Sequence, residues 1–329
     1  MPLTSYRTAG TTKLWRKGAT KMGNHYPVML NEAVDALQVK PDGVYVDCTL
    51  GRAGHSSLIL SKAKLGHLYS FDLDEEAMKE SKAKLEEVGD NFTLIRSNFA
   101  YLKDRLAELG VTEVDGILAD LGVSSPQFDE GSRGFSYKED ARLDMRMDQS
   151  QALSAYEVVN TYSEESLTKI FFEYGEEKDS KRIARNIVKA RAKKPIVTTF
   201  ELVDIIKASK SEKDLRKKGH PAKQVFQALR MEVNGEEDAL KALLQDGPTL
   251  LRSGGRLAII TFMSTDDRLV KKAFQELTIP KVDRHTISLP GEEELPYVLP
   301  NRKPILPSEK ELMENRRSAS AKLRVLEKR

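Results

Sequence analysis

Short apolar runs alternate with amphipathic stretches along the chain from Pro27 onward. The apolar runs have the length and composition of buried parallel strands, and the stretches between them carry the periodicity of helices. Strands are expected at residues 44–48, 67–71, 92–96, 116–120 and 256–262. Helices are expected to begin near His55, Asp74 and Phe99, each shortly after one of the first three strands. This order is typical of βαβ units and predicts an α/β fold with a parallel sheet.

The stretch between the fourth and fifth expected strands, from residue 120 to residue 256, is far longer than the others. Helical periodicity recurs within it at residues 164–174, 179–192 and 200–209, and again at 221–233 and 235–251. We therefore expect a small helical domain, residues 128–220, inserted into a sheet domain made of residues 24–127 and 221–307. Residues 1–23 are expected to be a disordered or added leader, and residues 308–329 a charged C-terminal helix or tail.

The numbers and positions of cysteine and histidine, and the lengths of the apolar stretches, argue against disulfide-bonded, zinc-binding and membrane-spanning proteins. The single Cys48 lies in an apolar run, which favours a buried, inert thiol. The five histidines include no pair at zinc-ligand spacing, so a structural metal site is not expected. No apolar stretch has the length of a membrane span or the form of a secretory signal. These features predict a cytoplasmic protein with no membrane partner.

The net charge of +3 conceals an uneven distribution. Residues 178–223 hold fifteen Lys and Arg against five Asp and Glu. A basic segment on an otherwise acidic protein indicates an anionic partner that contacts one face. A set of solvated helix surfaces is the alternative interpretation.

The turn after the first strand has the features of a nucleotide-like cofactor site. Gly51, Ala53 and Gly54 allow close backbone approach and free the start of a helix. Asp72, at the end of the second strand, is placed to accept hydrogen bonds from ribose hydroxyls. Phe99, just beyond the third strand, is placed to lie against an adenine. The dinucleotide fingerprint and the Walker loop are both absent, which favours S-adenosylmethionine over NAD or ATP. A nicotinamide-dependent dehydrogenase and a glycine turn that only packs helix on strand remain the alternatives.

The fourth strand ends in a polar turn where catalysis is expected, because ligands of open α/β sheets lie beyond the carboxyl ends of the strands. Asp120 is followed by Gly122 and then by Ser124, Ser125, Pro126 and Gln127. The predicted catalytic residues are Asp120, Ser125 and Pro126, which offer acceptors for a flat base amine. Asp120 is either an acceptor for the base amine or an acceptor for the amine of the cofactor.

Several motifs together resemble one known family. They are Asp47-x-Thr-x-Gly-Arg-x-Gly-His-Ser56, Asp120-Leu-Gly-Val-Ser-Ser-Pro-Gln127, Arg133-Gly-Phe-Ser-Tyr137, Leu143-Asp-Met-Arg-Met-Asp148, Tyr174-Gly-Glu-Glu-Lys178 and His220-Pro-Ala-Lys223 with Phe226-Gln-Ala-Leu-Arg230. The chain resembles the RsmH (MraW) family over residues 25–325. Members use S-adenosylmethionine to methylate N4 of a cytidine, position 1402, in the decoding region of bacterial 16S rRNA.

The resemblance implies a class I (Rossmann-like) methyltransferase sheet domain with an inserted helical domain. It also implies 16S rRNA or the small ribosomal subunit as partner, and a homodimer is left open. The implied cofactor contacts are Ala53, Gly54, His55, Asp72, Phe99, Asp120 and Gln127.

A base that is to be methylated must be extruded from its helix and stacked on the protein. Aromatic and basic residues of the insertion are therefore the candidates for contact with the RNA. Phe135 and Tyr137 are stacking candidates or else core aromatics. Arg133 and Arg142 are candidates for binding phosphate. The remaining candidates for substrate contact are Arg230 and Asn234, which lie one helical turn apart.

One segment departs from the family pattern. Where members usually read Phe-His-Ser-Leu-Glu-Asp-Arg, this chain has Phe262-Met-Ser-Thr-Asp-Asp-Arg268. Met263 and Thr265 thus replace a histidine and a leucine. The alternative function is therefore that of a diverged paralogue that binds or methylates a different RNA.

Overall fold

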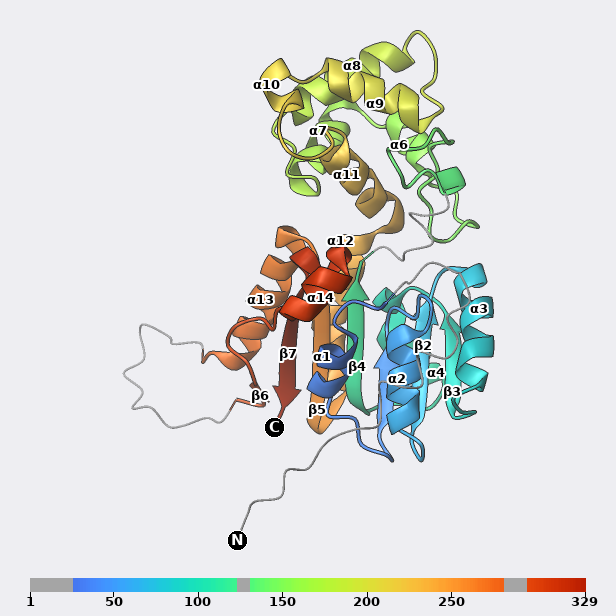
Figure 1. Ribbon diagram of the computed structural model, residues 1–329, viewed down its shortest axis with the longest axis vertical. Coiled ribbons are helices and arrows are strands. Elements are labelled where there is room, and N and C mark those ends of the chain that lie inside the picture. The colour runs from blue at the N-terminus through green and yellow to red at the C-terminus, as the bar shows by residue number, and fades with distance from the viewer. Residues whose placement is uncertain (1–25, 123–130, 281–294) are drawn as a thin grey trace.

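The computed structural model describes residues 26–122, 131–280 and 295–329 (Figure 1). Its sheet has the strand order β3-β2-β1-β4-β5-β7-β6. Strands β1 to β5 are parallel, and β7 is antiparallel to both β5 and β6. The strands are β1 (Val44–Asp47), β2 (His67–Asp72), β3 (Phe92–Arg96), β4 (Val114–Leu121), β5 (Leu251–Thr261), β6 (Tyr297–Val298) and β7 (Lys322–Lys328). This is the sheet of a class I methyltransferase, and all five predicted strands are confirmed.

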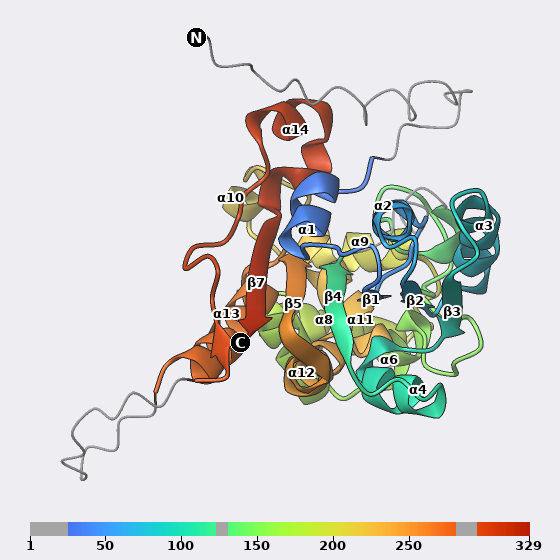
Figure 2. The same cartoon turned by 90° about the horizontal axis from the view of Figure 1, so that it is seen from below.

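Helices cover both faces of the sheet (Figure 2). They are α1 (Leu30–Ala36), α2 (Gly54–Lys62), α3 (Glu75–Glu86), α4 (Leu102–Glu108), α12 (Glu236–Asp246) and α13 (Ser264–Thr278). Side chains alternate along the strands, so Tyr45 and Leu118 pack with α1, α2 and α3, whereas Val46 and Ile117 pack with α4, α12 and α13. Burial on both faces explains why the parallel strands appear as continuous apolar runs.

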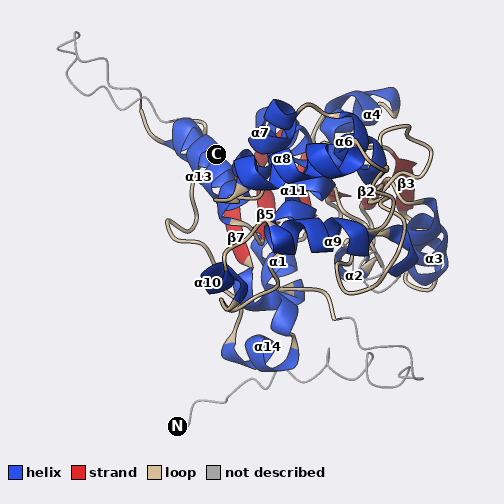
Figure 3. Cartoon of the chain, turned by 90° about the horizontal axis from the view of Figure 1, so that it is seen from above, coloured by secondary structure: helices blue, strands red, loops and turns tan. Residues whose placement is uncertain are grey.

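A helical unit stands over the carboxyl ends of the parallel strands (Figure 1). Its helices are α6 (Ala155–Thr161), α7 (Glu164–Glu173), α8 (Ser180–Arg191), α9 (Thr199–Ala208), α10 (Glu212–Leu215) and α11 (Lys223–Asn234). Capping boxes begin α6 at Ser154 and α9 at Thr198. Figure 3 shows that the described part of this unit consists of helices and loops.

The sequence placed the return to the sheet domain at residue 221, which is too early. Helix α11 buries Val225, Phe226, Leu229 and Val233 in the core of the helical unit. The chain leaves that core only at Gly235, whose φ of +60° allows the sharp change of direction between α11 and α12. The helical unit thus includes α11.

Residues 308–329, expected to be a charged C-terminal helix or tail, begin with a short helix but continue into a strand of the sheet. This segment forms α14 (Glu309–Glu314), a 3₁₀ turn (Arg316–Ser320) and β7, which lies beside β5. Leu323 and Leu326 are fully buried. Two of its charges are paired with the rest of the domain, since Arg324 binds Asp267 of α13 (2.7 Å) and Glu327 binds Arg256 of β5 (2.6 Å).

None of the described helices is both long and apolar enough to cross a membrane. The expected leader lies outside the described residues.

Candidate active site

The turn between β1 and α2 is preset beside the end of β2. Gly51 and Ala53 both have left-handed backbone, with φ of 48° and 55°. Such a conformation is uncommon for alanine and concentrates at functional sites. The Gly51 amide donates to Oδ2 of Asp72 (2.9 Å), which ties the turn to the sheet.

Asp72 is the last residue of β2, and its carboxylate can accept more hydrogen bonds than it does within the protein. Its two oxygens accept from the amides of Gly51 and Asp74, both at 2.9 Å. Each carboxylate oxygen has a further lone pair. Burial raises the pKa of Asp72 to about 6, although these hydrogen bonds oppose the rise. A partly buried carboxylate at this edge suits a pair of ribose hydroxyls.

Asp120 lies at the end of β4 and holds an unsatisfied acceptor. Its amide donates to the Thr49 hydroxyl (2.8 Å), which joins the ends of β1 and β4. Oδ1 is buried and has no hydrogen-bond partner among the described residues. Burial raises the pKa of Asp120 to about 6, while nearby His55 lowers it. An orphaned buried acceptor costs about 1–3 kcal/mol, which indicates that a donor belongs there.

His55 is buried at the start of α2 and faces Asp120. Its Nε2 lies 3.1 Å from the Val28 carbonyl oxygen, which only accepts, so Nε2 carries a proton. Nδ1 lies 4.0 Å from Oδ2 of Asp120. A cationic donor beside Asp120 would satisfy its unpartnered Oδ1.

Gly54 has a structural reason to be glycine. A Cβ there would lie 2.1 Å from Cγ of Pro27, so the segment before α1 requires the missing side chain. The sequence had assigned this glycine to close ligand approach. Ala53 is also fully buried, whereas Gly51 is partly buried and Arg52 is exposed. Phe99, in a 3₁₀ turn (Phe99–Tyr101) after β3, is partly buried at the same edge.

A family model described as the MraW methylase family matches residues 22–329. The chain belongs to the MraW methylase family. It is therefore an S-adenosylmethionine-dependent methyltransferase with a class I fold, as the resemblance implied.

Solved structures similar to this methyltransferase share little sequence with it. An rRNA methylase from Streptococcus thermophilus is 14% identical over 90% of this chain and 94% of that chain, with a TM-score of 0.39. A Streptococcus mutans protein in complex with SAH is 14% identical over 91% and 97%, with a TM-score of 0.39. TrmN from Thermus thermophilus is 14% identical over 92% and 48%, with a TM-score of 0.38. At such TM-scores, function has to be argued from the residues of this chain.

S-adenosylmethionine fits the edge formed by β1, β2 and β4. Asp72 would hold the ribose, Phe99 would border the adenine, and the cationic amine suits the unpartnered acceptor of Asp120. The orphaned Oδ1 of Asp120 is the observation that supports this fit. When bound, the cofactor supplies an electrophilic methyl group.

Part of the predicted site lies outside the described residues. Ser124, Ser125, Pro126 and Gln127 follow Gly122 in that segment. Their assignment to catalysis and cofactor binding remains a prediction.

The side chain of Arg133 makes contacts within the protein and is not free to bind a phosphate. Its side chain is 10% exposed and pairs with Asp74, the residue that caps α3, at 2.5 Å. The second terminal nitrogen donates to the carbonyls of Arg146 (2.8 Å) and Met147 (3.1 Å). Arg133 thus fastens the helical unit to the sheet domain, and the phosphate assignment is not supported.

The two stacking candidates have different surroundings. Phe135 is 4% exposed in the core of the helical unit, so the core interpretation is the right one. Tyr137 is partly buried and stacks on His220, with ring centroids 4.3 Å apart and planes inclined by 12°. Arg142 is exposed, 5.7 Å from the ring of Tyr156, and remains available to a ligand.

Arg230 and Asn234 also serve the architecture. Arg230 forms two hydrogen bonds with Glu236 (2.7 and 2.8 Å) across the junction of α11 and α12. The buried amide of Asn234 accepts from the Met147 amide (2.8 Å) and donates to the Met145 carbonyl (2.9 Å). Both side chains hold the junction near the sheet, so neither is free to bind a base.

The segment that departs from the family pattern begins α13. Met263 precedes this helix and is partly buried, two residues beyond the end of β5 at Thr261. Because Thr261 pairs with Leu121 of β4, Met263 lies at the sheet edge that carries Asp120. The replacement of histidine by methionine therefore falls beside the site.

Sequence reasoning missed Glu311, a buried carboxylate of α14. It accepts from the Met29 amide (2.7 Å), while Asn315 donates to the Tyr26 carbonyl (3.1 Å). The C-terminal segment therefore holds the segment that covers Gly54 and His55. No motif signals this contact, since the partners lie 282 residues apart.

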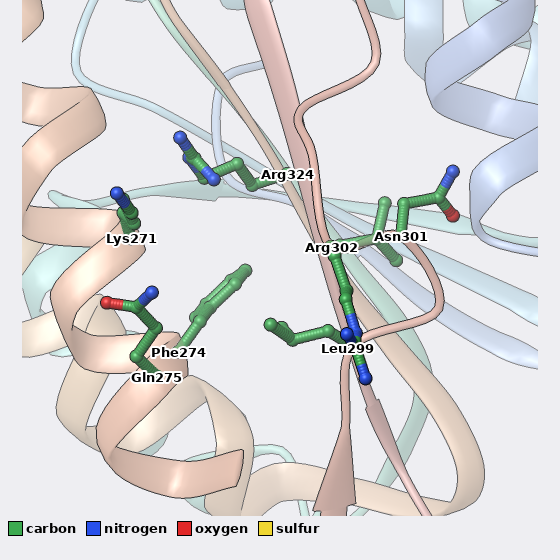
Figure 4. Close-up of a pocket in the computed structure, with 8 residues that line it drawn as sticks. Lys271, Phe274, Gln275, Leu299, Asn301, Arg302 and Arg324 are labelled. Atoms are coloured by element: carbon green, nitrogen blue, oxygen red, sulfur yellow. The ribbon is translucent and has the colours of Figure 1, made fainter. Parts of the chain in front are cut away.

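A small cavity lies away from this edge, between α13 and the segment next to β7 (Figure 4). Its volume is about 20 Å³, and Phe274, Leu299 and Arg302 are among the lining residues. This space accommodates one water molecule and excludes a cofactor.

Proposed function

We propose that this enzyme methylates N4 of a cytidine in the decoding region of 16S rRNA, as naked RNA or within the small subunit. The observation that carries the proposal is the buried, unpartnered Oδ1 of Asp120 beside the cofactor turn. An acceptor at the end of β4 suits either an exocyclic base amine or the amine of the cofactor. The family motifs around Asp120 and the basic surface support the same substrate.

Cytosine N4 is a weak nucleophile because its lone pair is delocalised into the ring. The site therefore has to position N4 and hold its N–H groups, more than supply a strong base. Alignment of this kind is worth up to about 7–11 kcal/mol in favourable systems. Asp120 is one candidate acceptor for these N–H groups, and the predicted catalytic residues Ser125 and Pro126 are the others.

Unpaired lysines on the helical unit support an RNA substrate. Arg182, Arg185 and Lys194 pair with acidic side chains, and Arg191 donates to backbone carbonyls. Eight lysines of residues 178–223 have no ion pair among the described residues: Lys178, Lys181, Lys189, Lys193, Lys207, Lys213, Lys218 and Lys223. Exposed lysines of this kind bind phosphates without reading sequence.

Methyl transfer tests the proposal. Purified protein is incubated with S-adenosylmethionine labelled in its methyl group and with small subunits, or 16S rRNA, from a strain that lacks this gene. The RNA is then digested and its nucleosides are separated by mass spectrometry. The expected product is labelled N4-methylcytidine, and label confined to other nucleosides, or no label at all, contradicts the proposal.

The second candidate is methylation of a different RNA, which the Met263 and Thr265 replacements favour. Transfer to total RNA, but not to the small subunit, would identify it. The variant Met263→His then serves as a test, since it should increase transfer to the small subunit if this position selects the substrate.

A further inference from the structure

A second cavity lies on the helical unit, distant from the cofactor edge. Its volume is about 320 Å³, and its lining includes Tyr137, Lys138, Phe200, Asp204, Lys207 and His220. The outer helix α9 supplies one wall, and the other is the segment of residues 136–141 with His220, which precedes α11. Figure 1 shows α9 in the layer of helices farthest from the sheet.

The cavity is too far from Asp120 to hold the base that is methylated. Helix α11 begins beside His220 and runs for 12 residues, about 18 Å, before its end at Asn234 reaches the junction with the sheet domain. A single base is much smaller than that length. Tyr137, assigned from the sequence to the target base, therefore belongs to a different place.

The walls of the cavity are held by hydrogen bonds. Thr199 of α9 donates its hydroxyl to the Glu139 carbonyl (2.6 Å) and accepts from the Ala141 amide (3.0 Å). The Phe200 amide donates to Asp140 (3.3 Å). The segment that carries Tyr137 and Lys138 is thus fixed along α9, so binding there costs little ordering of the protein.

The polar groups of the cavity favour an anion. Lys138 and Lys207 are exposed and have no ion pair among the described residues. The Ala222 amide donates to Nδ1 of His220 (3.3 Å), which leaves Nε2 as a donor in the neutral ring. Burial and the two lysines lower the pKa of His220, which keeps the ring neutral. Asp204 is the one acid of the lining.

The apolar groups favour a planar ring. Phe200 is 42% exposed, although a ring of this size is usually covered. Val203 and the stacked pair of Tyr137 and His220 complete the apolar lining. Aromatic rings beside cations are the usual elements of single-stranded RNA sites.

We propose that this cavity binds one unpaired nucleotide of the RNA substrate, away from the methylated base. The base would stack on Phe200, the phosphate would contact Lys138 and Lys207, and Asp204 would accept from an exocyclic base amine. Adenine offers such an amine and uracil does not, so adenine is the better ligand. The inference rests on the proposed RNA substrate but concerns binding alone.

Fluorescence anisotropy with labelled single-stranded A₆ and U₆ RNA tests the inference without a methyl donor. Phe200→Leu keeps an apolar side chain but removes the ring, and should weaken A₆ binding about 5-fold or more. Asp204→Asn should reduce the preference for A₆ over U₆. The pair Lys138→Ala with Lys207→Ala should weaken binding more than the matched pair Lys213→Ala with Lys218→Ala, which removes equal charge outside the cavity.

Equal losses in the two lysine pairs, with unchanged binding in Phe200→Leu, would overturn the inference. Equal affinity of wild-type protein for A₆ and U₆ that is abolished by inorganic phosphate would overturn it too, since it would identify a simple anion site. Thermal melting of each variant shows that it is folded. If these oligomers bind as expected while no RNA is methylated, the proposed function fails and the nucleotide site stands.

Discussion

Replacing Arg133 by methionine should destabilise the protein without directly removing an RNA contact. Arg133 and Asp74 are each about 10% exposed, and the loss of one partner from a buried ion pair costs about 3–5 kcal/mol. The entropy of unfolding is about 2.1 cal/mol/K per residue, which gives about 0.7 kcal/mol/K for the 329 residues of the chain. The melting temperature should therefore fall by about 4–7 °C.

A double-mutant cycle separates the ion pair from other effects. Asp74→Asn removes the charge but keeps a side-chain oxygen that caps α3, because asparagine is as good a cap as aspartate. The double variant should lose less stability than the sum of the single losses, with a coupling energy of about 1–3 kcal/mol. Urea unfolding followed by circular dichroism measures all four proteins. A melting temperature of Arg133→Met within about 1 °C of wild type, combined with weaker RNA binding, would refute the structural role and restore the phosphate assignment.

Three further predictions concern the cofactor edge and the C-terminal strand. Asp72→Asn should raise the Kd for S-adenosylhomocysteine about 10- to 150-fold by calorimetry, because one charged acceptor is lost, and an unchanged Kd would remove the ribose assignment. The Kd of the wild-type protein for S-adenosylhomocysteine should fall as pH rises through about 6, where Asp72 and Asp120 ionise. Asp120→Asn should make this pH dependence weaker. A wild-type Kd that is constant from pH 5 to 7 would argue against a role for these carboxylates in binding. Leu323→Ala should cost about 2–5 kcal/mol of unfolding free energy, whereas a disordered tail would tolerate it fully.

The same two carboxyls fix the sign of the pH dependence of stability. Their folded pKa values of about 6 exceed the unfolded value of about 3.9. The folded protein without cofactor therefore binds more protons between these values, and its free energy of unfolding decreases as pH rises from about 4 to 6. Cofactor binding, which uses the ionised forms, should offset this loss above pH 6.

The parallel strands could be predicted because each is buried on two faces and leaves an unbroken apolar run. Strand β7 could not, since it alternates Leu323 and Val325 with charged residues. Those charges are satisfied by partners elsewhere in the chain, such as Asp267 for Arg324, and a sequence does not display such partners. This antiparallel strand was therefore interpreted as part of a charged helix or tail.

The candidate site was predicted unevenly for a similar reason. Asp72 and Asp120 follow apolar runs directly, so their place at the sheet edge follows from the topology. Arg133 and Arg230 are motif residues whose partners decide their roles. Because an arginine suits a phosphate and a buried carboxylate equally well, only the folded structure distinguishes them.

The most direct test of the cofactor assignment is a crystal structure of this protein with S-adenosylhomocysteine at saturating concentration. The ribose hydroxyls are expected within about 3.2 Å of Asp72, and a ligand amine beside Oδ1 of Asp120. A ligand bound elsewhere, or an empty edge between β1, β2 and β4, would contradict it.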